Sequence, residues 1–146
     1  MNRTSQAGFS LVELMVVVTI IAILAVVVVG RFAGYTDKAK VTRAQSQISE
    51  YASALQLFKM DVGRFPTSGE GLESLDEKPA GADGWKEGGY ADVMNDPWGN
   101  PYEYRFDSTN NKFDIISYGA DGTPGGEGYN ADIKYSERKD WEKPGN

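Results

Sequence analysis

The sequence predicts an α+β fold in which one long N-terminal helix packs on a small antiparallel sheet. Three observations support this prediction. An apolar run extends to Gly30, an amphipathic helical pattern continues from there to Gly63, and two β-rich segments follow in a glycine-rich second half. At 146 residues the chain has room for a single domain beside its first helix.

Residues 9–30 are predicted to form the apolar part of the long helix. No charged residue occurs between Leu14 and Gly30. A hydrocarbon core about 30 Å thick is spanned by about 20 apolar residues in a helix, and a segment in lipid must satisfy its backbone groups internally. We therefore expect residues 9–30 to be a transmembrane and assembly helix.

Glu13 is the single charge within this apolar run. A carboxylate in a membrane segment is costly unless it is paired, and by default it indicates a functional site. The alternative is that the carboxylate reaches the headgroups, because it lies near the end of the run.

Residues 31–63 are predicted to continue the helix as an amphipathic segment. Apolar residues recur at spacings of three and four and so form one stripe, which we expect to pack on the sheet. Gly63 is expected to end the helix as its C-cap, whereas Gly30 and Gly34 mark its weakest point. The stripe consists of Val41, Ala44, Ile48, Tyr51, Leu55, Phe58 and Val62.

The composition narrows the possible functions. The chain has no His and no Cys, and its net charge is −6. Without His it lacks the commonest general base and the commonest zinc ligand, and without Cys it cannot form the disulfides common in small exported domains. An acidic chain is also unsuited to nucleic acid. We therefore expect a protein that is not an enzyme and does not bind nucleic acid.

Residues 64–146 are predicted to form the head of the molecule. Residues 102–106 alternate in polarity and residues 113–118 are β-rich, so both are strand candidates, joined by a turn at 107–111. A short helix is expected at about 68–75.

Single residues in the head carry further expectations. Glu70 either caps the short helix or is a solvated charge. Trp85 and Tyr90 are expected to anchor the loop around them, Trp98 to pack beneath a tight turn, and Trp141 to dock on the domain.

The segment SYGADGTPGGEGYNAD, residues 117–132, is rich in oxygen donors. Asp121, Glu127, Asn130 and Asp132 supply oxygen without any nitrogen or sulfur ligand. Such a donor set favours Ca²⁺, which takes six to eight oxygens in a flexible geometry. The spacing is not that of an EF-hand, and an ordinary acidic glycine-rich loop is the alternative.

The string GFSLVE, residues 8–13, resembles the processing signal of type IV pilins and pseudopilins. The resemblance implies that a prepilin peptidase cuts after Gly8 and methylates the new amine of Phe9. Removing the leader, residues 1–8, whose one charged side chain is Arg3, takes the net charge from −6 to −7. It also implies that Glu13 pairs with the amine of a neighbouring subunit, which buries both charges at low cost.

Three further strings resemble segments of the major pseudopilin of type II secretion systems: RFPTSGEGL at 64–72, DPWGNPY at 96–102, and SYGADG…DI from Ser117 to Ile133. By this resemblance the Asp121 and Asp132 side chains bind Ca²⁺, and Tyr118 offers its carbonyl. Ala131 stands where some members have an acid, so that role passes to Asn130 or to another oxygen.

The resemblance implies a type IV pilin-like fold and a single-pass protein of the bacterial inner membrane with its head in the periplasm. Such subunits polymerise into a pseudopilus that exports folded proteins across the outer membrane. The implied partners are copies of this chain, the prepilin peptidase, minor pseudopilins and the inner-membrane assembly platform. A type IV pilin for adhesion or twitching and a membrane-anchored calcium-dependent binding module are the alternatives.

Overall fold

The structure is a computed structural model that describes residues 10–141, with the helical backbone alone over residues 25–35. The chain divides into two compact units, Met1–Asp37 and Lys38–Asn146. Gly8 and Phe9 lie outside the described residues.

The helix α1 spans Leu11–Val62, so the apolar and the amphipathic segments form one element, as predicted. In the first unit, the side chains from Leu11 to Leu24 are exposed. The Thr19 hydroxyl donates to the Met15 carbonyl at 2.8 Å, which satisfies it within the helix. Over the residues that the structure describes, no helix combines the length and the apolarity that crossing a membrane requires.

In the second unit, the predicted apolar stripe of α1 forms one side of the core. Ile48, Leu55 and Phe58 are fully buried, and Val41 and Val62 pack against the cluster at its two ends. This confirms the helical periodicity that the sequence predicts.

The end of α1 is also as predicted. Gly63 has a φ of +86°, a left-handed conformation that suits glycine. Its N–H donates to the Lys59 carbonyl at 2.9 Å and so caps the last turn.

The sheet is antiparallel with the order β1-β2-β3. It consists of β1 (Glu103–Asp107), β2 (Lys112–Ser117) and β3 (Ile133–Lys134). The first two strands agree with the predicted segments to within one residue. β3 was not predicted, since two residues are too short to show a period-two pattern.

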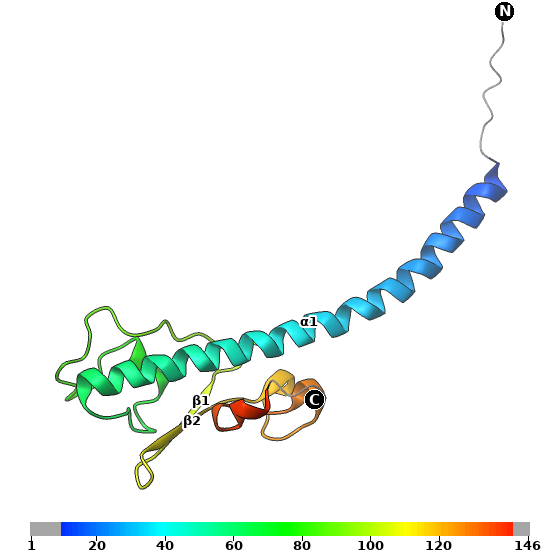
Figure 1. Ribbon diagram of the computed structural model, residues 1–146. Helices are drawn as coiled ribbons and strands as arrows, with labels where there is room; N and C mark the ends of the chain where they lie inside the picture. Colours follow the sequence, from blue (N-terminus) through cyan, green and yellow to red (C-terminus); the bar gives the residue numbers. More distant parts are fainter. Residues whose placement is uncertain (1–9, 142–146) are drawn as a thin grey trace, which may run out of the picture. The chain divides into compact units, whose positions relative to one another are not determined.

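The hairpin turn between β1 and β2 is organised by Asp107. Its Oδ1 accepts the N–H groups of Thr109 and Asn110. The C-terminal segment returns to β2, and Figure 1 shows it, in orange and red, beside the hairpin. There the Ser136 N–H and hydroxyl both donate to the Asp114 carboxylate at 2.9 and 2.8 Å.

The predicted helix at 68–75 is shorter than expected. The structure has a 3₁₀ helix, η1, only over Leu72–Leu75. Gly71 precedes it with a φ of +66°, and this left-handed residue separates η1 from the turn before it. Leu72 and Leu75 are buried in the core, so the packing role of the segment is retained.

The expected aromatic anchors of the head are confirmed. The Trp85 indole donates to the Ser74 carbonyl at 2.9 Å, and the Tyr90 hydroxyl donates to Asp61 Oδ2 at 3.1 Å. Trp98 and Trp141 pack against the core.

The described residues also form the 3₁₀ helices η2 (Gly119–Asp121), η3 (Gly128–Asn130) and η4 (Tyr135–Asp140).

Candidate functional site

The oxygen-rich loop, residues 118–132, connects β2 to β3. Ser117 pairs with Ile133 in the antiparallel register. Tyr118 and Asp132, which come next on either side, therefore leave the sheet side by side. The sheet thus brings together the two ends of the segment that the sequence identifies as a calcium-binding candidate.

A buried polar cluster holds the start of the loop. The Ser117 hydroxyl donates to Asp96 Oδ2 at 2.7 Å, and Asp96 itself is only 4% exposed. Asp96 Oδ1 accepts the N–H groups of Trp98 and Asn100 at 3.0 and 2.8 Å. The Asn100 side-chain amide then donates to the Gly119 carbonyl at 3.2 Å.

The sequence predicts the turn at 96–102 but not the support that this turn gives to the loop. The sequence feature that indicates this turn is the pair of turn-forming residues Asp96 and Asn100 on either side of the Pro-Trp-Gly tripeptide. Nothing in their local pattern specifies a partner on another strand.

Two glycines let the far arm of the loop approach the near arm. A Cβ on Gly119 would lie 2.7 Å from the Tyr129 carbonyl oxygen and 3.0 Å from that of Ala131. A Cβ on Gly126 would lie 2.5 Å from the Asn130 carbonyl oxygen. Three consecutive carbonyl groups therefore pack closely against Gly119 and Gly126, and an added Cβ at either glycine would clash with this carbonyl cradle.

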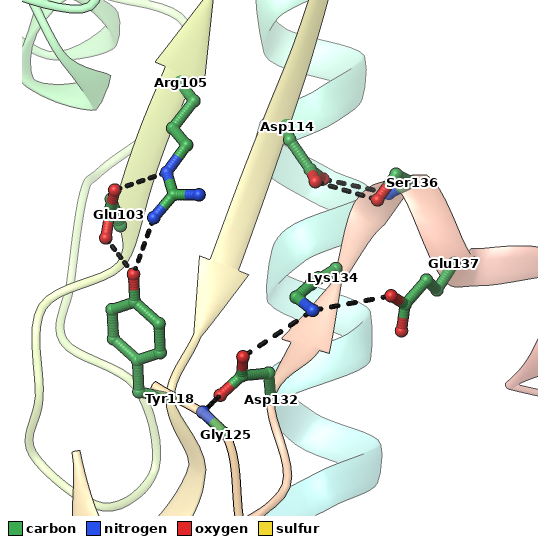
Figure 2. Close-up of polar contacts among 9 residues, drawn as sticks. All are labelled: Glu103, Arg105, Asp114, Tyr118, Gly125, Asp132, Lys134, Ser136 and Glu137. Carbon is green, nitrogen blue, oxygen red and sulfur yellow. Dashed lines mark hydrogen bonds and ion pairs between the residues drawn. The ribbon is translucent and has the colours of Figure 1, made fainter. Parts of the chain in front are cut away.

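The two predicted carboxylate ligands have local partners. Asp121 is exposed and its Oδ1 accepts the Thr123 N–H at 3.1 Å. Asp132 Oδ1 accepts the Gly125 N–H at 2.8 Å, and its Oδ2 lies 3.6 Å from Lys134 Nζ. Figure 2 shows Asp132 between these two groups.

The Tyr118 side chain points to β1 rather than into the loop. Its hydroxyl donates to Glu103 Oε2 and receives a hydrogen bond from Arg105 (Figure 2). The bond to Glu103 raises the pKa of the Tyr118 phenol, and the Arg105 guanidinium lowers the pKa of Glu103. With the phenol bound there, the group that Tyr118 has left for a ligand is its carbonyl.

These donors are of the kind that Ca²⁺ takes. They comprise carboxylates, an amide side chain and backbone carbonyls, all of them hard oxygens. Within residues 10–141, no three His, Cys, Asp or Glu side chains gather at a metal-binding distance. A site in this loop would therefore need backbone carbonyls beside its carboxylates, and the loop contains the carbonyls of Tyr129, Asn130 and Ala131.

The first turns of α1 present a second candidate site. Leu11, Val12 and Met15 are 76%, 66% and 63% exposed, and Glu13 lies in the first turn, also exposed. Such a continuous apolar surface is characteristic of an interaction or membrane surface.

A long N-terminal helix, packed in its second half on a small antiparallel sheet, with apolar turns ahead of it, defines a pilin-like subunit. Residues 3–29 match the family model described as the prokaryotic N-terminal methylation motif. Residues 31–136 match the family model of type II secretion system protein G. The chain belongs to the type II secretion system protein G family.

Curated relatives agree with this assignment. The chain is 44% identical over 137 residues to "Type II secretion system core protein G" of Pseudomonas aeruginosa, an alignment covering 91% of this chain and 96% of that protein. It is 40% identical over 136 residues to the protein of the same name from Xanthomonas campestris, covering 92% of each.

A solved structure agrees as well. The crystal structure of the major pseudopilin from the type 2 secretion system of enterohaemorrhagic Escherichia coli matches with a TM-score of 0.60 at 31% identity. The match covers 70% of this chain and 91% of that chain. The predicted family and fold are thereby confirmed, in preference to a type IV pilin or a separate binding module.

Proposed function

We propose that this chain is the major structural subunit of a type II secretion pseudopilus and polymerises through its N-terminal helix to drive export of folded proteins across the outer membrane. The observation that carries the proposal is the occurrence, in one chain, of the methylation motif over residues 3–29 and the protein G match over residues 31–136. The exposed apolar turns of α1 supply a surface for polymerisation.

The N-terminal residues have processing and assembly roles in this proposal. A prepilin peptidase cuts after Gly8 and methylates Phe9, and residues 9–30 hold the subunit in the inner membrane with the head in the periplasm. The carboxylate of Glu13 then neutralises the Phe9 amine of a neighbouring subunit, since an unpaired charge among apolar helices is costly. Minor pseudopilins and the inner-membrane assembly platform are the further partners.

The oxygen-rich loop has a structural role in the proposal. Asp121, Asp132, the Tyr118 carbonyl and Asn130 hold Ca²⁺, and the bound ion supplies stability to a head that has no disulfide. An ion that binds the folded state alone stabilises it by RT ln(1 + [Ca²⁺]/Kd). The loop backbone presents the carbonyls, and the Asp96 cluster holds its first arm in place.

Deletion of the gene tests the secretion role. We expect exoproteins to accumulate in the periplasm while surface pili stay normal, and the wild-type gene to restore secretion. Intact secretion with lost pili or twitching would instead identify a type IV pilin.

Thermal unfolding of the full chain in detergent tests the calcium role. We expect the melting temperature to rise with Ca²⁺, and Asp121→Ala to abolish the rise. Asp83→Ala is the matched control, because Asp83 is also an exposed aspartate but lies outside the loop. A wild-type melting temperature that does not change with Ca²⁺ would refute the proposed calcium role.

A further inference from the structure

We propose that Lys134 is a built-in competitor of Ca²⁺ that sets the affinity of the loop for the ion. The inference rests on the calcium site proposed above. Lys134 lies in β3, and Asp132 stands two residues before it, directly ahead of the strand. Its Nζ lies 3.6 Å from Asp132 Oδ2 (Figure 2).

The two oxygens of Asp132 are engaged differently. Oδ1 accepts the Gly125 N–H at 2.8 Å, a bond that shapes the loop itself. Oδ2 faces the Lys134 ammonium. A cation that binds Asp132 through Oδ2 therefore competes with the Lys134 ammonium for the same oxygen. Either the ammonium moves away, or its repulsion weakens the binding of the cation.

Burial makes this competition stronger than between charges on an open surface. The side chains of Asp132 and Lys134 are 13% and 32% exposed. Solvent screens partly buried charges less than exposed ones. With a divalent ion about 6 Å from the ammonium, the repulsion corresponds to about a tenfold loss in affinity at the dielectric constant of water.

Glu137 provides the ammonium with a second acceptor. Its Oε1 lies 3.5 Å from Lys134 Nζ, on the side away from Asp132 in Figure 2. Glu137 comes from η4 and its side chain is 55% exposed. When Asp132 binds an ion, the Lys134 ammonium can thus keep its ion pair with Glu137. This lowers the free-energy cost of breaking the ion pair with Asp132.

The arrangement predicts opposite effects for the two partners of Asp132. Replacing Lys134 removes the competitor and tightens Ca²⁺ binding about tenfold. Replacing Glu137 leaves Lys134 with Asp132 alone and weakens Ca²⁺ binding by about two- to threefold. A general loss of loop order would weaken binding in both variants, so the opposite signs separate competition from damage.

The experiment measures the Ca²⁺ dissociation constant of the full chain in detergent by competition with a fluorescent chelator. The variants are Lys134→Met, Lys134→Arg and Glu137→Gln, with Lys112→Met as the control because Lys112 is an exposed lysine at the β1–β2 turn. We expect tighter binding for Lys134→Met, weaker binding for Glu137→Gln, and wild-type binding for the arginine variant and the control.

The outcomes distinguish this inference from the proposal beneath it. Wild-type affinity in Lys134→Met overturns the competition while leaving the calcium site intact. If the wild-type chain binds Ca²⁺ too weakly to measure and Lys134→Met binds it measurably, the result supports the competition. Failure of every variant to bind Ca²⁺ overturns the calcium site and the competition together.

Discussion

The Ser117 hydroxyl and the Asp96 carboxylate form a hydrogen bond of 2.7 Å between a residue at the end of β2 and the turn at 96–100. Ser117 is fully buried and Asp96 is 4% exposed. In this way the oxygen-rich loop is fastened to a turn that lies 21 residues earlier in the chain.

Asp96→Ala is expected to destabilise the head by about 3 kcal/mol, since it leaves the Ser117 hydroxyl and the N–H groups of Trp98 and Asn100 without their acceptor. Urea unfolding of the full chain in detergent measures this loss. Asp92→Ala, at an exposed aspartate nearby, should change stability by less than about 0.5 kcal/mol. Equal losses in the two variants would show that the buried cluster has no special role.

Gly119→Ala tests the carbonyl cradle. Gly119 has a φ of +65°, and an added Cβ would meet the Tyr129 carbonyl oxygen at 2.7 Å. The conformational cost of about 1 kcal/mol and the steric clash act together, so we expect a loss above about 2 kcal/mol. Gly88→Ala isolates the first cost, because Gly88 has a φ of +90° and no atom within 4 Å of an added Cβ. A loss no larger than that of Gly88→Ala would contradict the close approach.

The Arg64–Glu70 pair predicts a pH-dependent contribution to stability. The Arg64 guanidinium holds both Glu70 oxygens at 2.7 Å, and the Thr67 N–H donates to Glu70 as well. These bonds, the one from Arg64 first, lower the pKa of Glu70 to about 2. Because the folded-state pKa lies below the unfolded one, the stabilisation is present above about pH 4.5 and is lost as the pH falls towards 2.

Glu70→Gln measures this contribution. At pH 7 we expect a loss of about 1 kcal/mol, a modest value because the pair is partly exposed. The difference from wild type should shrink between pH 4.5 and pH 2. Glu77→Gln, at an exposed glutamate just after η1, is the control variant. A difference that stays constant down to pH 2 would rule out the charged pair as its source.

Glu13→Ala tests the assembly role. The variant should still insert in the membrane and be cleaved after Gly8, since neither step uses the carboxylate in our proposal. Its filament yield should fall at least about tenfold, because the amine of a neighbouring subunit then has no counter-charge. Sheared filaments and cross-linked oligomers give the yield, with Ser10→Ala as a control at a nearby uncharged residue. Normal filaments from Glu13→Ala would refute the pairing.

The sequence predicts best those parts of the fold that repeat. Between Val41 and Val62, seven apolar residues recur at helical spacing and form the stripe. The strands β1 and β2 are long enough to show the residue pattern of a strand. The Gly63 cap follows from backbone chemistry at one position. β3 and the 3₁₀ helices η2, η3 and η4 have too few residues for any period, and tertiary contacts such as the Asp114–Ser136 bonds hold η4 in place.

The candidate site likewise has a part that the sequence predicts and a part that it does not. The oxygen donors of the loop are visible in the sequence as Asp121, Asn130 and Asp132. The contacts that position or oppose them are not, because they depend on pairing across strands. Thus Asp96 supports the loop from a distant turn, and Lys134 reaches Asp132 only through a strand that the sequence does not predict. For Glu70 the sequence leaves open a cap of the short helix or a solvated charge, and the structure shows neither. Its carboxylate binds Arg64 and the Thr67 N–H in the turn before η1, and η1 itself has no side-chain cap.

The pairing of Ser117 with Ile133 has a consequence for how this head tolerates insertions and deletions. The oxygen-rich loop is topologically an enlarged hairpin connection, so residues can be added or removed between 118 and 132 without changing which residues of β2 and β3 face each other. One residue inserted within β2 would instead turn every later side chain of that strand to the opposite face. The loop is therefore a segment that can be exchanged for one of different length while the pairing of β2 with β3 stays the same.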